Sequence, residues 1–240
     1  MRAFGESRDA DKSPSREDDA MTFKSKYAQM SRRAAMTAAA LAGMAALTGC
    51  GGGGAGAAAE GDMALGAPEG AKVTVIEYAS VTCHVCAAWH EQNWDAFKTA
   101  YVDNNKVRFV FREIPTPPAN VAAAGFMIAR CAGPDKYFDV VHELLSSQDE
   151  MFAGGDTSAA RAVLFRVGNG VGLSNSQIET CIKDPEAQAA VDERARAAQQ
   201  AGVIGTPTFL VNGVKVETPG SQSGTSMADL SKAIDAELAK

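Results

Sequence analysis

Residues 72–86 read KVTVIEYASVTCHVC, a β-branched and aromatic run that ends in two cysteines with two residues between them. The run from Lys72 to Tyr78 is typical of a buried strand. From Cys83 to Tyr101, aromatic residues recur at near-helical spacing among polar ones, which predicts a helix. The Cys-x-x-Cys pair therefore lies where a strand gives way to a helix.

A second strand is predicted at Val107–Ile114, just before a proline-rich turn. Strand, helix and strand in about 45 residues form a βαβ unit, in which the two strands are parallel and the crossover is right-handed. The chain that follows shows helical patterns broken by glycine and proline. Helices are predicted at Ala119–Cys131, Lys136–Leu145, Thr157–Val167, Ser174–Lys183 and Pro185–Ala201.

The end of the chain returns to strands. Thr208–Val211 and Val214–Val216 flank Asn212-Gly213, whose tolerance of positive φ is a strong hairpin signal. Ser226–Ala239 carries apolar residues on one face and predicts an amphipathic helix. The sequence thus predicts an α/β fold, in which a helical insertion at about 118–202 separates a βαβ half from a ββα half.

The cysteine pair has the spacing that thiol exchange needs. Cys83 is expected at a helix N-terminus, where free backbone N–H groups and the helix dipole stabilise a thiolate, so we predict that it is the nucleophile. One helical turn brings Cys86 within disulfide reach, where it can resolve a mixed disulfide. A static bridge or half of a zinc site are the alternatives, but Cys131 and Cys181 do not form a second pair at zinc spacing. We therefore expect no metal.

The segment Val75–Cys86, together with Gly205-Thr206-Pro207-Thr208-Phe209, resembles the DsbA-like family of bacterial disulfide oxidoreductases. The resemblance extends from about Lys72 to the C-terminus. It implies a thioredoxin fold with a helical insertion and no cofactor. It also implies a cis peptide bond between Thr206 and Pro207 beside the cysteine pair, where the backbone of Thr206 would pair with an incoming substrate chain.

Two further residues are interpreted through this resemblance. The family places a buried acid on the strand before its cysteine pair, and Glu77 in that position could accept the proton of Cys86. Alternation along one strand does not settle its face, so an exposed acid is the alternative. Strong oxidants of the family usually have Pro-His between the cysteines, whereas this chain has His84-Val85. His84 could still favour the Cys83 thiolate, but the sequence does not predict the reduction potential of the pair.

Residues 1–49 are predicted to be a signal peptide. A polar segment ends at Arg32-Arg33, and the apolar run after it is shorter than the roughly 20 residues that span a bilayer. Leu47-Thr48-Gly49-Cys50 resembles a bacterial lipobox, which implies cleavage before Cys50 and a lipid on it; an ordinary cleavage site is the alternative. The arginine pair fits twin-arginine or general secretory export, and translation could begin at Met21 or Met30.

Residues 50–70 are rich in glycine and alanine and predict a flexible tether, so the folded domain is expected at 71–240. The chain has five cysteines. If Cys50 carries a lipid and Cys83 and Cys86 form the exchange pair, Cys131 and Cys181 remain. An oxidising compartment favours a disulfide between them, and two buried free thiols are the alternative. The chain has 23 basic and 29 acidic residues, which argues against a nucleic-acid partner.

These features predict a monomeric, periplasmic, membrane-anchored thiol:disulfide oxidoreductase that introduces disulfide bonds into unfolded exported proteins with free cysteines. The resemblance implies reoxidation by a DsbB-like membrane quinone reductase. A disulfide isomerase or reductase of the same fold is the nearest alternative. From another class, Cys83 and Cys86 could hold Cu(I) in a carrier or copper-tolerance protein.

Overall fold

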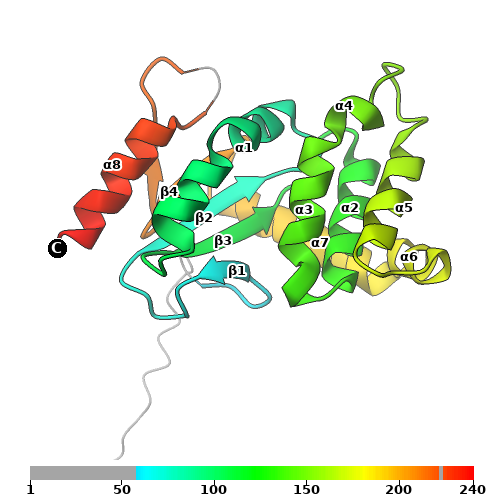
Figure 1. The fold of residues 1–240 in the computed structure, drawn as a ribbon, viewed down its shortest axis with the longest axis horizontal. Helices are drawn as coiled ribbons and strands as arrows, with labels where there is room; N and C mark the ends of the chain where they lie inside the picture. The colour runs from blue at the N-terminus through cyan, green and yellow to red at the C-terminus, as the bar shows by residue number, and fades with distance from the viewer. Residues whose placement is uncertain (1–57, 222–223) are drawn as a thin grey trace, which may run out of the picture. The chain divides into compact units, whose positions relative to one another are not determined.

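The computed structural model describes residues 58–221 and 224–240 as a mixed sheet with helices on both faces (Figure 1). The predicted signal peptide, the lipid site at Cys50 and the start of the tether lie outside the described residues. Five strands follow the order β1-β3-β2-β4-β5, with β2 parallel to β3 and the other neighbours antiparallel. Their bounds are β1 Met63–Gly66, β2 Thr74–Ala79, β3 Arg108–Glu113, β4 Thr208–Val211 and β5 Val214–Val216.

The helices follow the predicted order, and the α/β architecture with a helical insertion is confirmed. They are α1 His84–Phe97 with its π-helical continuation η1 Lys98–Val102, α2 Ala119–Cys131, α3 Pro134–Ser146, α4 Gln148–Met151, α5 Ala160–Gly170, α6 Asn175–Ile182, α7 Pro185–Gln200 and α8 Met227–Leu238. The sequence patterns missed α4, which is a single turn and too short to show a period. Within the described part of the chain, no helix has the length and apolarity needed to cross a bilayer.

The prediction that the flexible tether extends to residue 70 was wrong for its last residues. Met63–Gly66 form β1 at the edge of the sheet, where Met63 lies opposite Phe111 and Leu65 opposite Phe109. Both Met63 and Leu65 pack against the main apolar cluster. Pairing with β3 uses backbone groups, which a glycine- and alanine-rich composition does not exclude. The folded domain therefore begins before residue 71.

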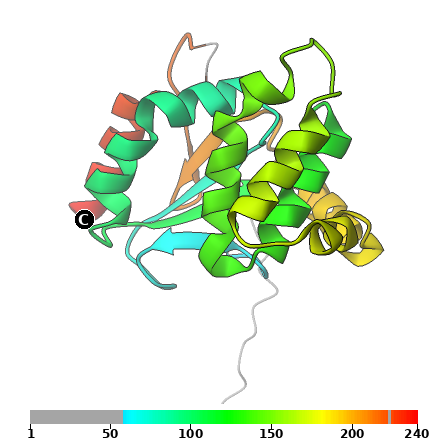
Figure 2. The same ribbon diagram turned by 45° about the vertical axis from the view of Figure 1, so that its right-hand side comes forward.

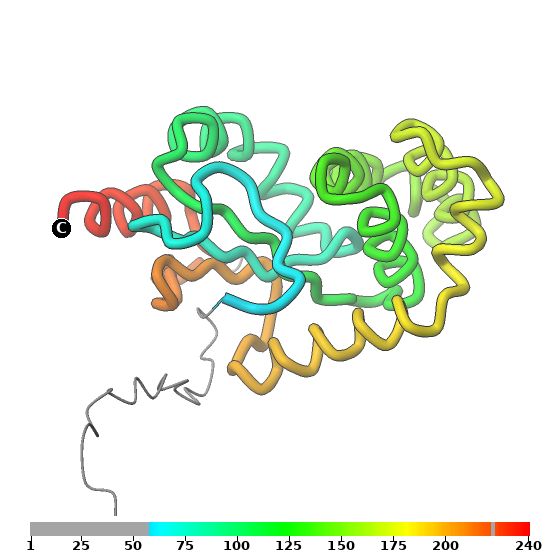
Figure 3. The backbone as a smooth tube through the Cα atoms, turned by 90° about the horizontal axis from the view of Figure 1, so that it is seen from below, coloured from blue at the N-terminus to red at the C-terminus, as the bar shows by residue number. Residues whose placement is uncertain are grey.

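The two faces of the sheet have separate covers, and β2 shows how they divide. Val75 and Ala79 pack in the large cluster beneath α1 and α8 (Figures 1 and 2). Ile76 and Tyr78 pack in a smaller cluster with Ala198 of α7, which crosses the opposite face (Figure 3). Because side chains alternate along a strand, Glu77 shares the α1 face. The large aromatic residues of α1 and β3 are all buried: Trp89, Trp94, Phe97, Phe109 and Phe111.

The insertion is fastened to the sheet through a buried carboxylate. Glu113 at the end of β3 is 1% exposed and accepts hydrogen bonds from Arg130 of α2 (2.7 Å), Tyr137 of α3 (2.9 Å) and Arg194 of α7. A buried charge needs such partners, because desolvation without them costs several kcal/mol. Three helices of the insertion are thereby held at one strand end.

A disulfide joins Cys131, the last residue of α2, to Cys181 of α6, and their Cα atoms are 6.2 Å apart. We expect Cys131→Ala together with Cys181→Ala to lower the free energy of unfolding by about 2–4 kcal/mol, because the cross-link restricts the unfolded chain. Urea denaturation of both proteins with the Cys83–Cys86 pair held reduced would measure the difference. Equal free energies of unfolding would contradict a stabilising role for the bridge.

Candidate active site

Cys83 occupies the N-cap of α1, with extended backbone angles (φ −88°, ψ 113°). Its sulfur is half-buried and lies 3.5 Å from the carbonyl oxygen of Thr206. Cys86, one turn into α1, is fully buried, and both are free thiols in this structure. The arrangement leaves one sulfur open to a partner chain and hides the other behind it.

The two thiols have opposite acidities. The pKa of Cys83 falls from 9.0 to about 5, chiefly because Cys86 donates a hydrogen bond to the thiolate. The Thr206 side chain and the backbone N–H groups of Cys86 and Val85 lower it further, against the effect of burial. Burial raises the pKa of Cys86 far above its usual value, and the charges of Cys83 and Glu77 raise it further. At neutral pH, Cys83 is therefore the thiolate and Cys86 the thiol.

The loop facing the pair contains the Thr206–Pro207 peptide bond, which is cis. Pro207 is buried, whereas Thr206 is half-exposed beside the sulfur of Cys83. An open groove of 490 Å³ runs along this loop to Lys215 and Gly224. Ile204 on its wall is 95% exposed, which is unusual for a large apolar side chain.

Glu77 is fully buried on the α1 face, so the exposed alternative is wrong. Both of its carboxylate oxygens bind Nε2 of His90, at 3.0 and 2.9 Å. No role was predicted for His90 from the sequence. Its position four residues after Cys86 was a usable signal, because residues i and i+4 share one face of a helix.

His84 is placed less centrally than predicted. It is exposed and lies on the wall of a pocket between α1, α3 and α4. The groups that lower the pKa of Cys83 are instead Cys86, Thr206 and the backbone at the start of α1.

The insertion also reaches the cysteine pair. Gln148, the first residue of α4, is buried and donates from Nε2 to the carbonyl oxygens of Val81 (2.9 Å) and Cys83 (3.1 Å). One side chain thus fixes the turn between β2 and α1 on which the nucleophile stands. Sequence reasoning missed it, because no local pattern links positions so far apart. Among the described residues, no group of three or more histidine, cysteine or acidic side chains could hold a metal ion.

Comparison with protein families gives a match over residues 58–236 to the family model described as thioredoxin. A protein of Rickettsia typhi, provisionally named a protein-disulfide oxidoreductase, is 32% identical over 178 residues, which are 74% of this chain and 62% of that one. Its counterpart in Rickettsia prowazekii is 31% identical over 74% of this chain and 61% of its own. The chain thus spans about three fifths of the length of these curated relatives.

Solved structures share the same fold. The crystal structure of Wolbachia pipientis alpha-DsbA1 has a TM-score of 0.66 and 22% identity, and the match covers 76% of this chain and 93% of that one. Oxidised BdbD from Bacillus subtilis has a TM-score of 0.63 and 18% identity, with 75% and 94% of the two chains covered. These similarities show the fold alone.

Proposed function

This chain belongs to the thioredoxin family, and from that premise we propose that it acts as a DsbA-like enzyme, which introduces disulfide bonds into exported proteins by dithiol–disulfide exchange at Cys83 and Cys86. The relatives named protein-disulfide oxidoreductases support the class of reaction. The geometry of the pair supports the division of labour between its two sulfurs.

Exchange begins when a substrate thiolate attacks Sγ of Cys83 in the oxidised pair, because Cys86 is buried and out of reach. The Cys83–Cys86 bond breaks, and Cys86 leaves as a thiolate that takes up a proton. The second substrate thiolate then attacks the substrate sulfur of the mixed disulfide, and Cys83 leaves as a thiolate. The groove beside Thr206 and Ile204 would hold the extended substrate chain meanwhile.

The single observation that carries the oxidase direction is the Cys83 pKa of about 5. A stabilised thiolate favours the reduced form of the enzyme, and an enzyme whose reduced form is favoured tends to oxidise its substrates. The same low pKa makes Cys83 a good leaving group in the last step. The proposed direction therefore rests on the surroundings of Cys83 and not on the dipeptide His84-Val85 between the cysteines.

The test is the reduction potential of the Cys83–Cys86 pair, measured by equilibration with glutathione, together with oxidation of a reduced, unfolded protein. We expect a potential well above the roughly −270 mV of thioredoxin and rapid oxidation of the substrate. A potential near that of thioredoxin would contradict the oxidase and favour a reductase. Tight Cu(I) binding with no thiol exchange would contradict the enzyme altogether.

We also propose that the protein works in the periplasm as a monomer, anchored by a lipid on Cys50 and reoxidised by a DsbB-like quinone reductase. The apolar run before Leu47-Thr48-Gly49-Cys50 supports export and lipidation. Expression of the full chain in bacteria should give a membrane-bound product whose N-terminal peptide carries acyl chains, as mass spectrometry would detect. A soluble product of Cys50→Ala is the matched control, and an unmodified, soluble wild-type chain would contradict the anchor.

A further inference from the structure

We propose that His90 and His142 form a proton relay that joins Glu77, beside the buried Cys86, to the pocket between α1, α3 and α4. The inference rests on the proposed exchange function and assigns the route by which Cys86 exchanges its proton. His90 and His142 act through Glu77, so they are positioning and relay residues.

The relay begins at the Glu77–His90 pair. Nε2 of His90 holds both oxygens of Glu77, and the His90 residue is only 7% exposed. Its other ring nitrogen, Nδ1, is buried and has no hydrogen-bond partner within the described residues. Such an atom is costly unless it serves a purpose or meets a water molecule. One end of the ring is therefore fixed to the acid, and the other end is available to pass a proton.

His142 of α3 supplies the next step. Its ring centroid lies 5.3 Å from that of His90, and its Nε2 is likewise buried without a partner in the described part of the chain. Trp94 fixes both rings, stacking on His90 at 5.2 Å and meeting His142 edge-on at 4.2 Å. A neutral imidazole carries one donor and one acceptor nitrogen, which is what a relay requires. Because neither of the two unpartnered nitrogens is hydrogen-bonded to the other, a proton would pass between the rings through one bridging water.

The relay opens to solvent through the pocket, whose volume is 510 Å³. Both histidines lie on its wall, together with Gln148 of α4. Other titratable side chains on that wall are His84, Glu91, Asp95 and Asp149. The pocket therefore brings solvent to the edge of both residues, whose unpartnered nitrogens are buried just behind its wall, while Cys86 stays fully buried.

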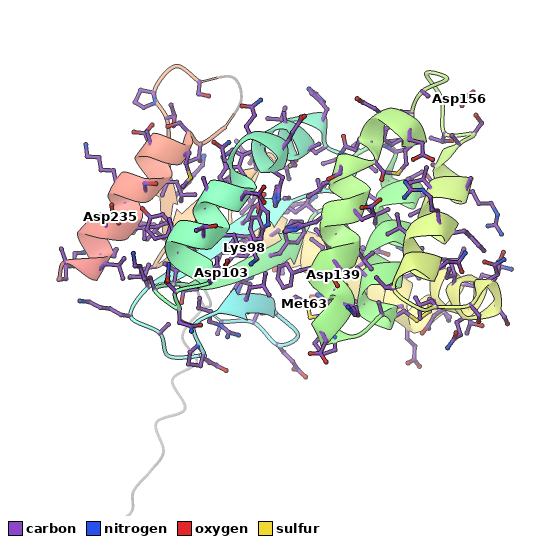
Figure 4. All side chains as sticks on the ribbon, viewed as in Figure 1. Met63, Lys98, Asp103, Asp139, Asp156 and Asp235 are labelled. Atoms are coloured by element: carbon purple, nitrogen blue, oxygen red, sulfur yellow. A yellow bond between two sulfur atoms is a disulfide. The ribbon has the colours of Figure 1, made fainter. Side chains whose placement is uncertain are left out.

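Burial, more than the neighbouring charges, keeps the His142 ring neutral. Its pKa falls to about 3, first because of burial and then because of the neighbouring His90 and Lys98, while Asp139 acts in the opposite direction. Lys98 follows α1 and Asp139 lies on α3, as labelled in Figure 4. Glu77 of β2 contacts the neighbouring His90. The His142 ring can thus pass a proton on while it stays neutral at rest over the working range of pH.

The chemistry balances with the groups present. Substrate thiolate attacks Sγ of Cys83, a new sulfur–sulfur bond forms there, and the bond to Cys86 breaks with its electron pair on Cys86. The Cys86 thiolate takes one proton from the protonated form of the Glu77–His90 pair, which leaves a carboxylate and a neutral imidazole, because burial strongly favours the Cys86 thiol. The pair then regains that proton from the pocket through His142. When the enzyme is reoxidised by a disulfide, the proton leaves Cys86 along the same route.

The test follows a single turnover of the oxidised full chain with a reduced peptide dithiol in stopped flow from pH 5 to 9. His142→Ala removes the relay without touching Glu77, and His90→Gln keeps a donor to Glu77 but no second ring nitrogen. Because proton transfer by a positioned group contributes 10²–10⁴-fold, we expect both variants to slow formation of reduced enzyme by roughly 10-fold or more and to change the pH profile. Added imidazole should restore His142→Ala by binding in the pocket.

Glu91→Gln, on the same pocket wall, is the matched control and should keep the wild-type rate and profile. Wild-type rates and pH profiles in both histidine variants would overturn the relay while leaving the exchange function intact. A slow His142→Ala enzyme that imidazole does not restore would also overturn it, because loss of packing cannot be repaired that way. A wild-type chain that performs no exchange would instead overturn the proposed function.

Discussion

Replacing Cys83 by serine is expected to abolish dithiol–disulfide exchange, lowering kcat/KM by roughly 10⁴-fold or more. A serine hydroxyl is not ionised at neutral pH and cannot form a disulfide, so no mixed disulfide with the substrate can arise. The buried Cys86 cannot take over, because its sulfur is shielded and its pKa is raised. Oxidation of a reduced, unfolded protein at pH 7 would measure the loss.

Cys86→Ser is the matched control, because it leaves the exposed nucleophile in place. When this variant meets a substrate that carries a disulfide, the Cys83 thiolate should attack one substrate sulfur and stay joined to it while the other substrate sulfur leaves as a thiol. Mass spectrometry after tryptic digestion would locate this mixed disulfide on Cys83. Cys83→Ser should trap nothing. Substantial exchange by Cys83→Ser, or trapping on Cys86, would reverse the roles assigned to the two sulfurs.

Much of the fold could be predicted because its signals are local. The signals are the β-branched run around Val75, the helical spacing of Trp89 and Phe97, and the turn at Asn212-Gly213, and each depends on residues close together in the chain. The order of elements then restricted the topology, because βαβ units are right-handed and parallel. The N-terminal placement of Cys83 on α1 followed from the same local pattern.

The rest depends on contacts between distant residues. Glu77 is buried because β2 lies between β3 and β4 under α1, which no single strand can show. Gln148 meets the carbonyl of Cys83 only after the insertion folds back. β1 owes its place to the free edge of β3 and has no strong pattern of its own. The burial of Glu77 and the contact of Gln148 with Cys83 therefore could not be predicted from local sequence patterns.

The reduced protein should ionise Cys83 with a midpoint near pH 5. At pH 7 about 99% of this sulfur would be thiolate, against about 1% for a thiol with a pKa of 9, so alkylation by iodoacetamide should stay fast until the pH falls below 5. The thiolate absorbance near 240 nm, measured from pH 3 to 9, would give the midpoint. A midpoint above pH 8 would contradict the assigned environment and with it the oxidase direction.

The same ionisation links stability to pH. The folded pKa of Cys83 lies below its unfolded value of 9.0, so its contribution to the stability of the reduced form is complete above about pH 9 and lost as the pH falls through about 5. Cys86 adds no slope in this window, because its raised pKa leaves it protonated in both states below about pH 9. The oxidised form has neither thiol and lacks this dependence. As the pH falls from 8 to 4, the reduced form should therefore lose stability relative to the oxidised form, as measured by their free energies of unfolding. Cys86→Ala should raise the Cys83 pKa and weaken this dependence, because it removes the hydrogen bond that lowers the pKa most, whereas Cys86→Ser retains a donor.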